Sequence, residues 1–569
     1  MKTKNLIMFA VAACCAAISG SCCLRIETAT TPELTTVGNP YMPLWEHIPD
    51  GEPYVFEDPD QPGKYRVYVY GSHDNLVTAY CGRDQVVWSA SVDSLNNWRY
   101  DGVILVVDKN AKGEPFDSAS TADVLYAPDV TLVTDKDGKK TYYLFPNDQT
   151  GYRNGLIAKS DRPDGPFEVC NWNADDPVKV DGIYGFDPAV FVDDDGRVYG
   201  YWGFGHSMAA EIDPTTMCTV KPGTKAVDGM ISGFKEPGKF RFFEASSIRK
   251  IKDKYVFIYS RFTEDGEFGL PSSNYTLAYA YSDNPLGPWT YGGTIIDGRA
   301  REKDEQGNVI ASATPDGNTH GSICEINGQW YVFYHRQTGT DEYARQAMVA
   351  PISVKVEEGA GGKVEISEGE YNSQGFALNG LDPFERHSAG IACWYTGPKP
   401  ATHEWPNNTF YGSYVAATYG SKESVKTTAD TWNPKEKYDM PYDLRYNTNP
   451  VVNNTDGSIV GYKYFNFNAL DNQANLMLCL NLIPEGIDGT IEVMLDRPWT
   501  SQVGKLIGQA ELKADMPKTV TTVAIGISDD VKANYLAGKH AIYFVFKSDT
   551  KEKSLCTLED FYFTYDKKN

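Results

Sequence analysis

The chain has 569 residues, more than one compact domain usually holds, so we expect two or three domains. Aromatic residues make up 13% of the chain, glycine and proline are plentiful, and long helical heptads are absent, a profile typical of a β-rich globular protein. The formal net charge of −23 argues against nucleic acid as a partner, because a polyanion would be repelled and no basic stripe offsets the charge.

The N-terminus has the pattern of a secretory signal peptide. Two lysines precede an apolar run, Leu6–Ile18, which is too short to span a bilayer and is followed by small residues. Cys22 comes directly after them, as in a bacterial lipobox, although Ser19 stands where a larger aliphatic residue is usual. We expect residues 1–22 to be a lipoprotein signal and residues 23–38 a linker. The protein would then be an exported bacterial lipoprotein of the periplasm or outer membrane, held to the membrane only by its lipid; plain secretion is the alternative.

The cysteines follow no binding pattern. Four of the 11 lie in the leader, and the other seven are scattered singly without CxxC spacing. This excludes a thiolate zinc site and a dense disulfide scaffold. We expect most of the seven to be small, buried, apolar residues.

From residue 39 to 375 one theme recurs, in which an alternating apolar-aromatic strand, a tight turn and another strand follow one another. Period-2 alternation of aromatic and β-branched residues is the signal of a half-buried strand. Units about 50–70 residues apart indicate radial repetition, as in a β-propeller, with a β-sandwich plus extra strands as the alternative. The recurring strands are Tyr65–Tyr70, Thr141–Phe145, Arg197–Trp202, Lys254–Tyr259 and Gln329–Tyr334.

An acidic residue or a histidine stands near the start of an extended segment in each unit. These residues are Asp50, Asp129, Asp187, Glu244 and His320. In a propeller the innermost strand of each blade lines the central axis, so these side chains would converge there. Five unrelated loops would not place polar residues in phase, and the convergence predicts a functional site.

After residue 376 the sequence pattern changes to a loop-rich aromatic stretch, which short alternating strands follow. Examples of these strands are Leu476–Leu480, Gly489–Asp496 and His540–Phe546. We expect residues 376–569 to form a second all-β domain, a β-sandwich of jelly-roll type.

The first region resembles glycoside hydrolase family 43, the five-bladed propeller glycosidases. The resemblance covers about residues 39 to 375, and the order and spacing of its motifs are specific. It is carried by Phe186–Gly196, Glu244–Lys250, Ser282–Trp289, His320–Ile323 and Trp330–Arg336. It implies an all-β fold with a five-bladed β-propeller and a glycosidase activity.

The resemblance also implies three catalytic carboxylates. Asp50 matches the general base that activates water, Asp187 the carboxylate that orients the acid and raises its pKa, and Glu244 the general acid. The first motif departs from the family, because its usual Asp-Pro is Asp50-Gly51 here, and Glu52 before a proline is the alternative base.

Three carboxylates suit an inverting hydrolysis. An oxocarbenium-like transition state needs an ionised base on one face of the sugar and a protonated acid on the other, with about 6.5–9.5 Å between them to admit water. A third carboxylate beside the acid makes the acid harder to ionise and keeps it protonated near neutral pH.

Two further residues resemble the family's binding residues. His320 matches the axial histidine that often helps to hold a water-coordinated ion, commonly Ca²⁺, in the channel, although a lone histidine is also often structural. Arg345 matches an arginine that contacts a sugar hydroxyl, with a surface arginine as the alternative. No organic cofactor is implied. Three aromatic residues flank the site and suit either sugar stacking or the blade core, namely Phe186, Trp202 and Phe243.

The C-terminal region resembles a family 6 carbohydrate-binding module, mainly through Gly461–Phe465, Gly489–Val493 and Gly538–Phe544. Such modules hold sugars by aromatic stacking, and a purely structural sandwich is the alternative. The candidate stacking residues are Trp394, Trp405 and Trp432.

The activity that we expect is exo-acting α-L-arabinofuranosidase on plant-type polysaccharides or oligosaccharides. Within the same family the alternatives are β-xylosidase, galactosidase or galactofuranosidase, and endo-arabinanase. The alternative from another functional class is a glycan-binding lipoprotein without catalytic activity. The altered first motif, Asp50-Gly51, keeps this alternative open.

Overall fold

The computed structural model describes residues 32–75, 79–116, 123–149, 153–417, 449–471 and 474–566. Strands dominate this part of the chain, which contains one short α-helix, α2 (Asp529–Asn534), so the predicted all-β class is confirmed at this level. None of the helices within these ranges has the length and apolarity needed to span a bilayer. The expected signal peptide, residues 1–22, and Trp432 lie outside the described residues.

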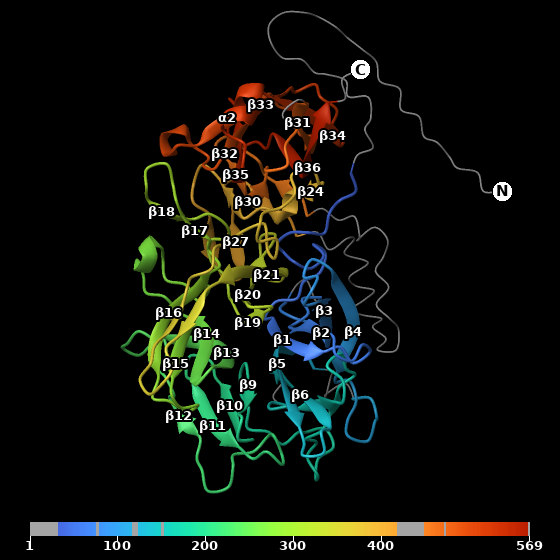
Figure 1. Cartoon of the computed structure of the whole chain (residues 1–569), viewed down its shortest axis with the longest axis vertical. Coiled ribbons are helices and arrows are strands. Elements are labelled where there is room, and N and C mark those ends of the chain that lie inside the picture. Colours follow the sequence, from blue (N-terminus) through green and yellow to red (C-terminus); the bar gives the residue numbers. More distant parts are fainter. Residues whose placement is uncertain are drawn as a thin grey trace, which may run out of the picture. The chain divides into compact units, whose positions relative to one another are not determined.

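In the described chain, residues 52–352 form five consecutive antiparallel sheets (Figure 1). The first sheet consists of β1 (Glu52–Glu57), β2 (Tyr65–Tyr70), β3 (Asp84–Ser91) and β4 (Trp98–Val106). The second consists of β5 (Leu125–Thr134), β6 (Lys140–Asp148), β7 (Ala158–Ser160) and β8 (Glu168–Val169). The third consists of β9 (Ala189–Val192), β10 (Val198–Trp202), β11 (Met208–Ile212) and β12 (Val227–Asp228), and the fourth of β13 (Phe242–Ile251), β14 (Lys254–Arg261), β15 (Thr276–Ser282) and β16 (Thr290–Asp297). The fifth consists of β19 (Ser322–Ile326), β20 (Gln329–Gln337) and β21 (Arg345–Ile352).

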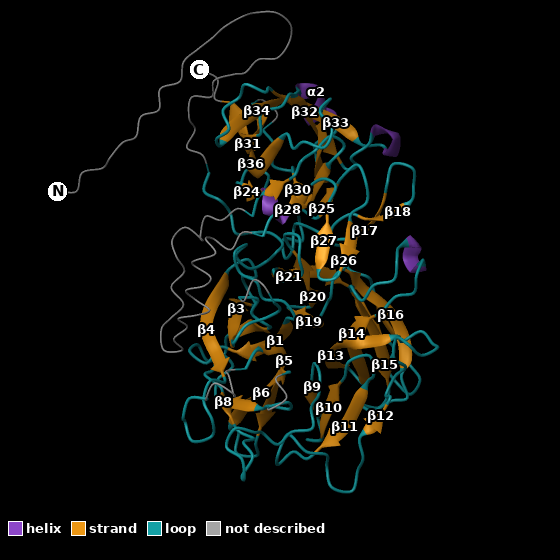
Figure 2. Ribbon diagram, turned by 180° about the vertical axis from the view of Figure 1, so that it is seen from behind, coloured by secondary structure: helices purple, strands orange, loops and turns teal. Residues whose placement is uncertain are grey.

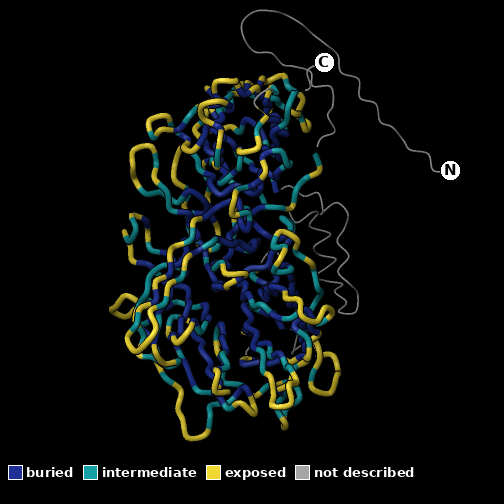
Figure 3. Tube along the Cα trace, viewed as in Figure 1, coloured by how far each residue is buried: buried dark blue, intermediate teal, exposed yellow. Residues whose placement is uncertain are grey.

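Each of the five predicted aromatic strands overlaps the second strand of one of these sheets. In β2 the two faces pack against different neighbours. Val67 and Val69 belong to a hydrophobic cluster with Phe333 of the fifth sheet, whereas Tyr68 and Tyr70 cluster with residues of the second sheet. A strand that is buried on both faces needs apolar or aromatic residues at almost every position, which accounts for the sequence pattern. Figure 3 shows how much of the chain inside these sheets is buried.

The first strands of the sheets contact one another in a closed order, β1 with β5, β5 with β9, β9 with β13, β13 with β19, and β19 with β1. Figure 2 shows these five strands gathered at the centre of this region. The loops that lead into them therefore meet at one end of the ring. This arrangement brings together residues that are up to about 300 positions apart in sequence.

The C-terminal region contains two larger antiparallel sheets. One has the order β28-β29-β36-β31-β34, with β24 also paired to β36, and the other β25-β30-β35-β32-β33. The strands of the first are β24 (His387–Ser388), β28 (Tyr414–Val415), β29 (Val451–Val452), β31 (Asn475–Pro484), β34 (Thr521–Ile527) and β36 (Cys556–Asp566). Those of the second are β25 (Trp394–Thr396), β30 (Ile459–Asn466), β32 (Gly489–Leu495), β33 (Lys505–Leu512) and β35 (Lys539–Lys547).

Both C-terminal sheets contribute to one hydrophobic cluster, with Leu478 and Leu480 from one sheet and Val493 and Phe544 from the other. The same cluster includes Val332 of the fifth sheet, so the core continues from the first region into the second. Burial of this apolar surface is the main free-energy term that holds the two regions together.

Three hairpins and three 3-10 helices complete the described chain. The hairpins are β17–β18 (Arg301–Lys303, Val309–Ala311), β22–β23 (Val354–Val356, Val364–Ile366) and β26–β27 (Thr402–Glu404, Asn407–Thr409). The 3-10 helices are η1 (Glu267–Gly269), η2 (Ala389–Ile391) and η4 (Thr500–Gln502).

Two sequence predictions about individual residues have clear outcomes. All seven cysteines in the described residues are free, and six of them are buried, as expected for small apolar residues. The prediction that Trp394 stacks on a sugar is wrong, because its side chain is fully buried at 0% exposure among Tyr543, Met494 and Ile459. Trp394 starts β25, and the pleat of that strand turns it into the core.

Candidate active site

A cavity of about 580 Å³ lies where the loops into the first strands meet. Asp50, Asp187, Glu244, His320 and Arg345, all singled out from the sequence, line it. Asp129, which the recurring pattern also places at the axis, is not part of this lining, and its Oδ1 accepts a hydrogen bond from Tyr54 Oη at 2.6 Å. Other lining residues include Tyr80, Tyr126, Gln149, Asn274, Asp316, Asn318, Glu342, His403 and Trp405. The volume is in the range of pockets that bind small molecules or short oligomers.

Asp50 is a buried carboxylate two residues before β1. Ser72 Oγ donates a hydrogen bond to its Oδ2 at 2.6 Å, and Arg345 Nη1 donates one to Oδ1 at 3.2 Å. Burial by itself would raise the pKa of Asp50, but the positive charge of Arg345 and the Ser72 hydrogen bond bring the pKa below its ordinary value. Asp50 is therefore ionised at neutral pH, the state that a general base needs.

Glu52, the alternative base, is not part of the lining of this cavity. Its Oε2 accepts a hydrogen bond from Arg249 Nη2 at 2.7 Å, and its side chain is only 1% exposed. Residues two apart in a regular strand point to the same side. Asp50, however, precedes the strand and has a left-handed φ of 60°, so its carboxylate and that of Glu52 lie in different environments.

Asp187 is held by two hydrogen bonds from different sheets. Asn147 Nδ2 at the end of β6 donates to its Oδ1 at 2.7 Å, and the backbone N–H of Ala245 donates to its Oδ2 at 3.0 Å. His320 Nδ1 lies 3.6 Å from the same Oδ2. The carboxylate thus has a fixed orientation beside Glu244.

Glu244 lies on β13 between two irregularities of the β13–β14 register, at Phe242/Glu244 and Glu244/Ser247. Such bulges redirect a side chain out of the regular pleat, here toward the cavity. Burial raises the pKa of Glu244 well above its ordinary value, and the negative charge of Asp187 raises it further. A carboxyl group that holds its proton in this way suits a general acid.

The backbone at the site is strained. Asp50, Asp187 and Ala245 have φ values of 60°, 47° and 67°, in the left-handed region that side chains other than glycine seldom adopt. Each such residue costs on the order of 1 kcal/mol or more, and such residues cluster at functional sites. The packing of the five sheets supplies the free energy that maintains this geometry.

His320 lies at the centre of the ring, between Asp187 and Glu52. Its position depends on Gly321, where an added Cβ would lie 1.9 Å from the Phe333 carbonyl oxygen. His320 Nε2 is 4.0 Å from Glu52 Oε1, and neither atom has a hydrogen-bond partner although both are buried.

These orphaned polar atoms allow a test of the expected calcium ion. Ca²⁺ takes six to eight oxygen ligands, and the described residues contain no group of three or more His, Cys, Asp or Glu side chains arranged to hold a metal. The donors fit a hydrated ion held through water by His320 and Glu52, and do not form an all-protein cage. Without an ion, burial lowers the pKa of His320, but Asp187, Asp50 and Glu52 together raise it to about 9, so that the ring itself is cationic.

Arg345 begins β21 and is 3% exposed. Its Nε and Nη2 donate to both oxygens of Asp74, at 2.9 and 2.8 Å, while Nη1 reaches Asp50 and Asn318. The surface-arginine alternative is therefore wrong. The guanidinium lines the cavity, but most of its donors fix neighbouring side chains.

Several lining residues are not predicted from the sequence. Asp74 lies four residues after the end of β2 and forms the bidentate pair with Arg345, and Tyr80 lies under the same guanidinium at 5.0 Å. Tyr80 Oη donates a hydrogen bond to Glu342. An acidic residue shortly after an aromatic strand was the available signal for Asp74; Tyr80 and Glu342 lie in irregular loops, where no periodicity marks them.

A row of phenylalanine rings forms one wall of the cavity beside Glu244. Phe204 packs against Phe186 and Phe243, with ring centroids 4.9 Å apart in both pairs, and Phe243 packs against Phe262 at 5.4 Å. The flanking Trp202, by contrast, is buried in a separate hydrophobic cluster and does not line the cavity.

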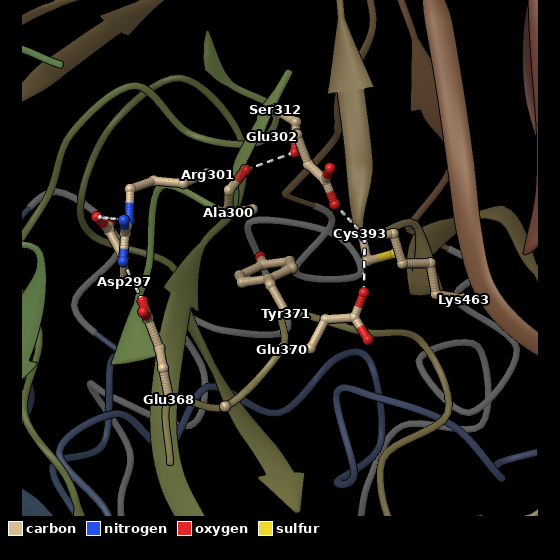
Figure 4. Close-up of a pocket in the computed structure, with 11 residues that line it drawn as sticks. Asp297, Ala300, Arg301, Glu302, Ser312, Glu368, Glu370, Tyr371, Cys393 and Lys463 are labelled. Carbon is tan, nitrogen blue, oxygen red and sulfur yellow. Dashed lines mark hydrogen bonds and ion pairs between the residues drawn. The ribbon is translucent and has the colours of Figure 1, made fainter. Parts of the chain in front are cut away.

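A second polar cavity, of about 300 Å³, lies where the first region meets the C-terminal sheets (Figure 4). Lys463 of β30 forms ion pairs there with Glu302 and Glu370, and Arg301 pairs with Asp297 and with Glu368. Its charged side chains are thus paired with one another across the junction, and we interpret it as a structural contact.

The fold and the site together define a class of enzyme. One sugar-sized cavity in a β-sheet scaffold is lined by an ionised carboxylate, Asp50, a protonated carboxyl group, Glu244, and a third carboxylate, Asp187. An inverting glycosidase needs such a set of carboxyl groups.

Comparison with known proteins supports this class of enzyme. The model of the family described as glycosyl hydrolases family 43 matches residues 55–358. A xylosidase/arabinosidase of Thermoclostridium stercorarium is 31% identical over 548 residues, covering 91% of this chain and 98% of that protein. An arabinoxylan arabinofuranohydrolase of Paenibacillus polymyxa is 28% identical over 403 residues, covering 66% of this chain and 58% of that protein.

One solved structure that aligns with this chain is a family 43 arabinoxylan arabinofuranohydrolase from Bacillus subtilis in complex with cellotetraose. The alignment has a TM-score of 0.42 and 20% identity, and it covers 94% of this chain and 99% of that chain. The chain belongs to glycosyl hydrolases family 43 and is a glycosidase that hydrolyses O-glycosyl bonds. Inversion of configuration is consistent with this family. The non-catalytic alternative is not retained.

Proposed function

We propose that the protein is an inverting, exo-acting α-L-arabinofuranosidase that acts on plant-type polysaccharides or oligosaccharides. The observation that carries the proposal is the opposite direction of two pKa shifts in one cavity, with Asp50 held ionised and Glu244 held protonated. The arabinose specificity rests on the names of relatives, several of which are xylosidase/arabinosidases or arabinoxylan arabinofuranohydrolases.

In the proposed reaction, Asp50 accepts a proton from a water molecule while the water oxygen attacks the anomeric carbon. Glu244 donates its proton to the glycosidic oxygen as the bond between that oxygen and the anomeric carbon breaks. Attack and departure occur on opposite faces of the sugar, so the anomeric configuration inverts. Each proton transfer contributes about 10²–10⁴-fold to the rate.

Asp187 is the proposed positioning residue for the acid. Its charge keeps the proton on Glu244, and its hydrogen bond from Ala245 fixes the backbone next to the acid. Arg345 is proposed to hold Asp50 in place and ionised, and to donate from Nη1 to a sugar hydroxyl that replaces Asn318 Oδ1 as acceptor. Glu52 is disfavoured as the base because Arg249 holds it outside the cavity.

The proposed scaffold is a five-bladed β-propeller over residues 39–375, followed by a β-sandwich over residues 376–569. The five consecutive sheets and the closed order of contacts among their first strands support the propeller. The two C-terminal sheets with a shared core support the sandwich.

A hydrated cation such as Ca²⁺ is proposed at His320 and Glu52. When bound, it would supply positive charge beneath the cavity, near Asp187 and Asp50. Isothermal titration of EDTA-treated protein with Ca²⁺ tests it, and a His320→Ala variant should lose the binding heat.

We also propose that the mature protein is a lipoprotein anchored through Cys22, exported to the periplasm or outer membrane. The lipobox-like sequence supports it. A Cys22→Ser variant should move from the membrane fraction to the soluble fraction of cells that express it.

A screen of para-nitrophenyl glycosides tests the activity, with hydrolysis of the α-L-arabinofuranoside expected to be fastest. Faster hydrolysis of the β-D-xyloside would favour the second candidate, β-xylosidase, which the names of four relatives support. Proton NMR of the sugar first released tests inversion. Retention of configuration would contradict the roles given to Asp50 and Glu244.

A further inference from the structure

The lining of the cavity includes a residue from outside the matched catalytic region. Trp405 forms the tip of the β26–β27 hairpin, and His403 of the same hairpin also lines the cavity. The family match ends at residue 358, so this hairpin belongs to the C-terminal part of the chain.

The hairpin is anchored to the loop between β20 and β21. The backbone N–H of Asn408 donates to the Thr340 carbonyl at 2.9 Å, and Asn407 forms a β-bridge with Asp341. His403 Nε2 lies 3.4 Å from Glu342 Oε1. Backbone pairing of this kind fixes where the tip points.

Trp405 itself makes one polar contact with the first region. Its Nε1 donates to Tyr80 Oη at 3.3 Å, and Tyr80 in turn packs on the guanidinium of Arg345. The indole is nevertheless 68% exposed, the largest exposed fraction among the aromatic side chains of the described residues. An indole fixed at its N–H edge and open on its ring faces is suited to stack on an apolar surface such as the face of a sugar ring.

We propose that Trp405 is a sugar-binding residue at the mouth of the active site, and that it binds the part of an oligosaccharide that extends beyond the sugar being cleaved. The inference rests on the proposed glycosidase function of the cavity. Asp50 and Arg345 lie deeper, at 5% and 3% exposure, so the sugar at the anomeric centre is bound below Trp405. The C-terminal region thus completes the active site and sets its preference for extended substrates.

The test compares Trp405→Ala, Trp405→Phe and the wild type on an arabinoxylo-oligosaccharide and on a para-nitrophenyl α-L-arabinofuranoside. For Trp405→Ala we expect KM for the oligosaccharide to rise about tenfold, the equivalent of one lost stacking contact. We expect kcat to stay within about twofold, because the carboxylates are untouched, and Trp405→Phe to restore most of the affinity. For the aryl glycoside KM should change less than for the oligosaccharide.

Tyr411→Ala is the matched control, because Tyr411 is an exposed aromatic residue of the same region, at 41%, that lines a different cavity. It should leave both KM values unchanged. Melting temperatures of all variants show whether each is folded. Isothermal titration of the oligosaccharide into Glu244→Gln, with and without Trp405→Ala, measures binding without turnover and should show an about tenfold difference in Kd.

An oligosaccharide KM and Kd for Trp405→Ala within about twofold of the wild type, in a protein that still cleaves the substrate, would overturn the inference and leave the proposed function intact. A wild-type protein that neither binds nor cleaves any of these sugars would overturn the proposed function, and the inference with it.

Discussion

The carboxylate of Asp187 accepts a hydrogen bond at 3.0 Å from the backbone N–H of Ala245, the residue next to Glu244. One contact therefore joins the third and fourth sheets at the cavity and fixes the proposed acid relative to Asp187. Burial raises the pKa of Glu244, and the charge of Asp187 raises it further. Asp187 thus contributes to both the position and the protonation of Glu244.

Asp187→Asn should move the alkaline limb of the pH–kcat/KM profile to lower pH. Activity requires protonated Glu244, and removal of the Asp187 charge lowers the pKa of Glu244, so the proton is lost earlier as pH rises. We expect kcat at pH 7 to fall about 10²-fold or more. The measurement is a pH–rate profile beside that of Asp195→Asn, an exposed carboxylate of the β9–β10 turn that should leave the profile unchanged.

Asp50→Asn should abolish general-base catalysis and reduce kcat by about 10³-fold at every pH. Glu52→Gln should keep kcat within about tenfold of the wild type but lower the melting temperature, because the largely buried Arg249 side chain, at 13% exposure, loses its charged partner. Steady-state kinetics and thermal melts of the two variants check this. The reverse ranking of the two kcat values would assign the base to Glu52.

His387→Gln should remove part of the acid sensitivity of folding. Burial lowers the pKa of His387 to about 4, so between the unfolded value and that pKa the unfolded chain binds a proton that the folded chain does not. Wild-type stability should therefore fall by about 1.4 kcal/mol per pH unit through this group as pH drops from about 6.5 to 4. Urea unfolding at pH 7 and pH 4.5 should show a smaller loss for the variant, and equal losses would contradict the assignment.

Lys463→Met should destabilise the junction between the two regions. Lys463 is 5% exposed and pairs with Glu302 and Glu370, which would be left without their cation (Figure 4). We expect a loss of about 2 kcal/mol, less than for a fully buried pair because Glu370 is half exposed. Chemical unfolding measures the loss, and Lys513→Met, which breaks an exposed pair with Glu511, should cost clearly less.

The sequence by itself determined the strand type and the identity of the candidate catalytic residues. Alternation in Tyr65–Tyr70 and its four counterparts identifies strands because the period of side-chain direction is local. Asp187 and Glu244 could be predicted because each is a polar residue at a fixed offset from such a strand, and motif spacing is also a property of the sequence.

Only the tertiary structure shows that Asp50 meets Arg345 and that Glu52 meets Arg249, the contacts on which the proposal of Asp50 as the base rests. It also placed Trp394 in the core and Trp405 at the cavity, although both are tryptophans of one loop-rich stretch. These outcomes depend on contacts between segments far apart in the chain, with 197 positions between Glu52 and Arg249 and 325 between Tyr80 and Trp405. Charge and burial act through space, so the chain order of the partners carries no information about them.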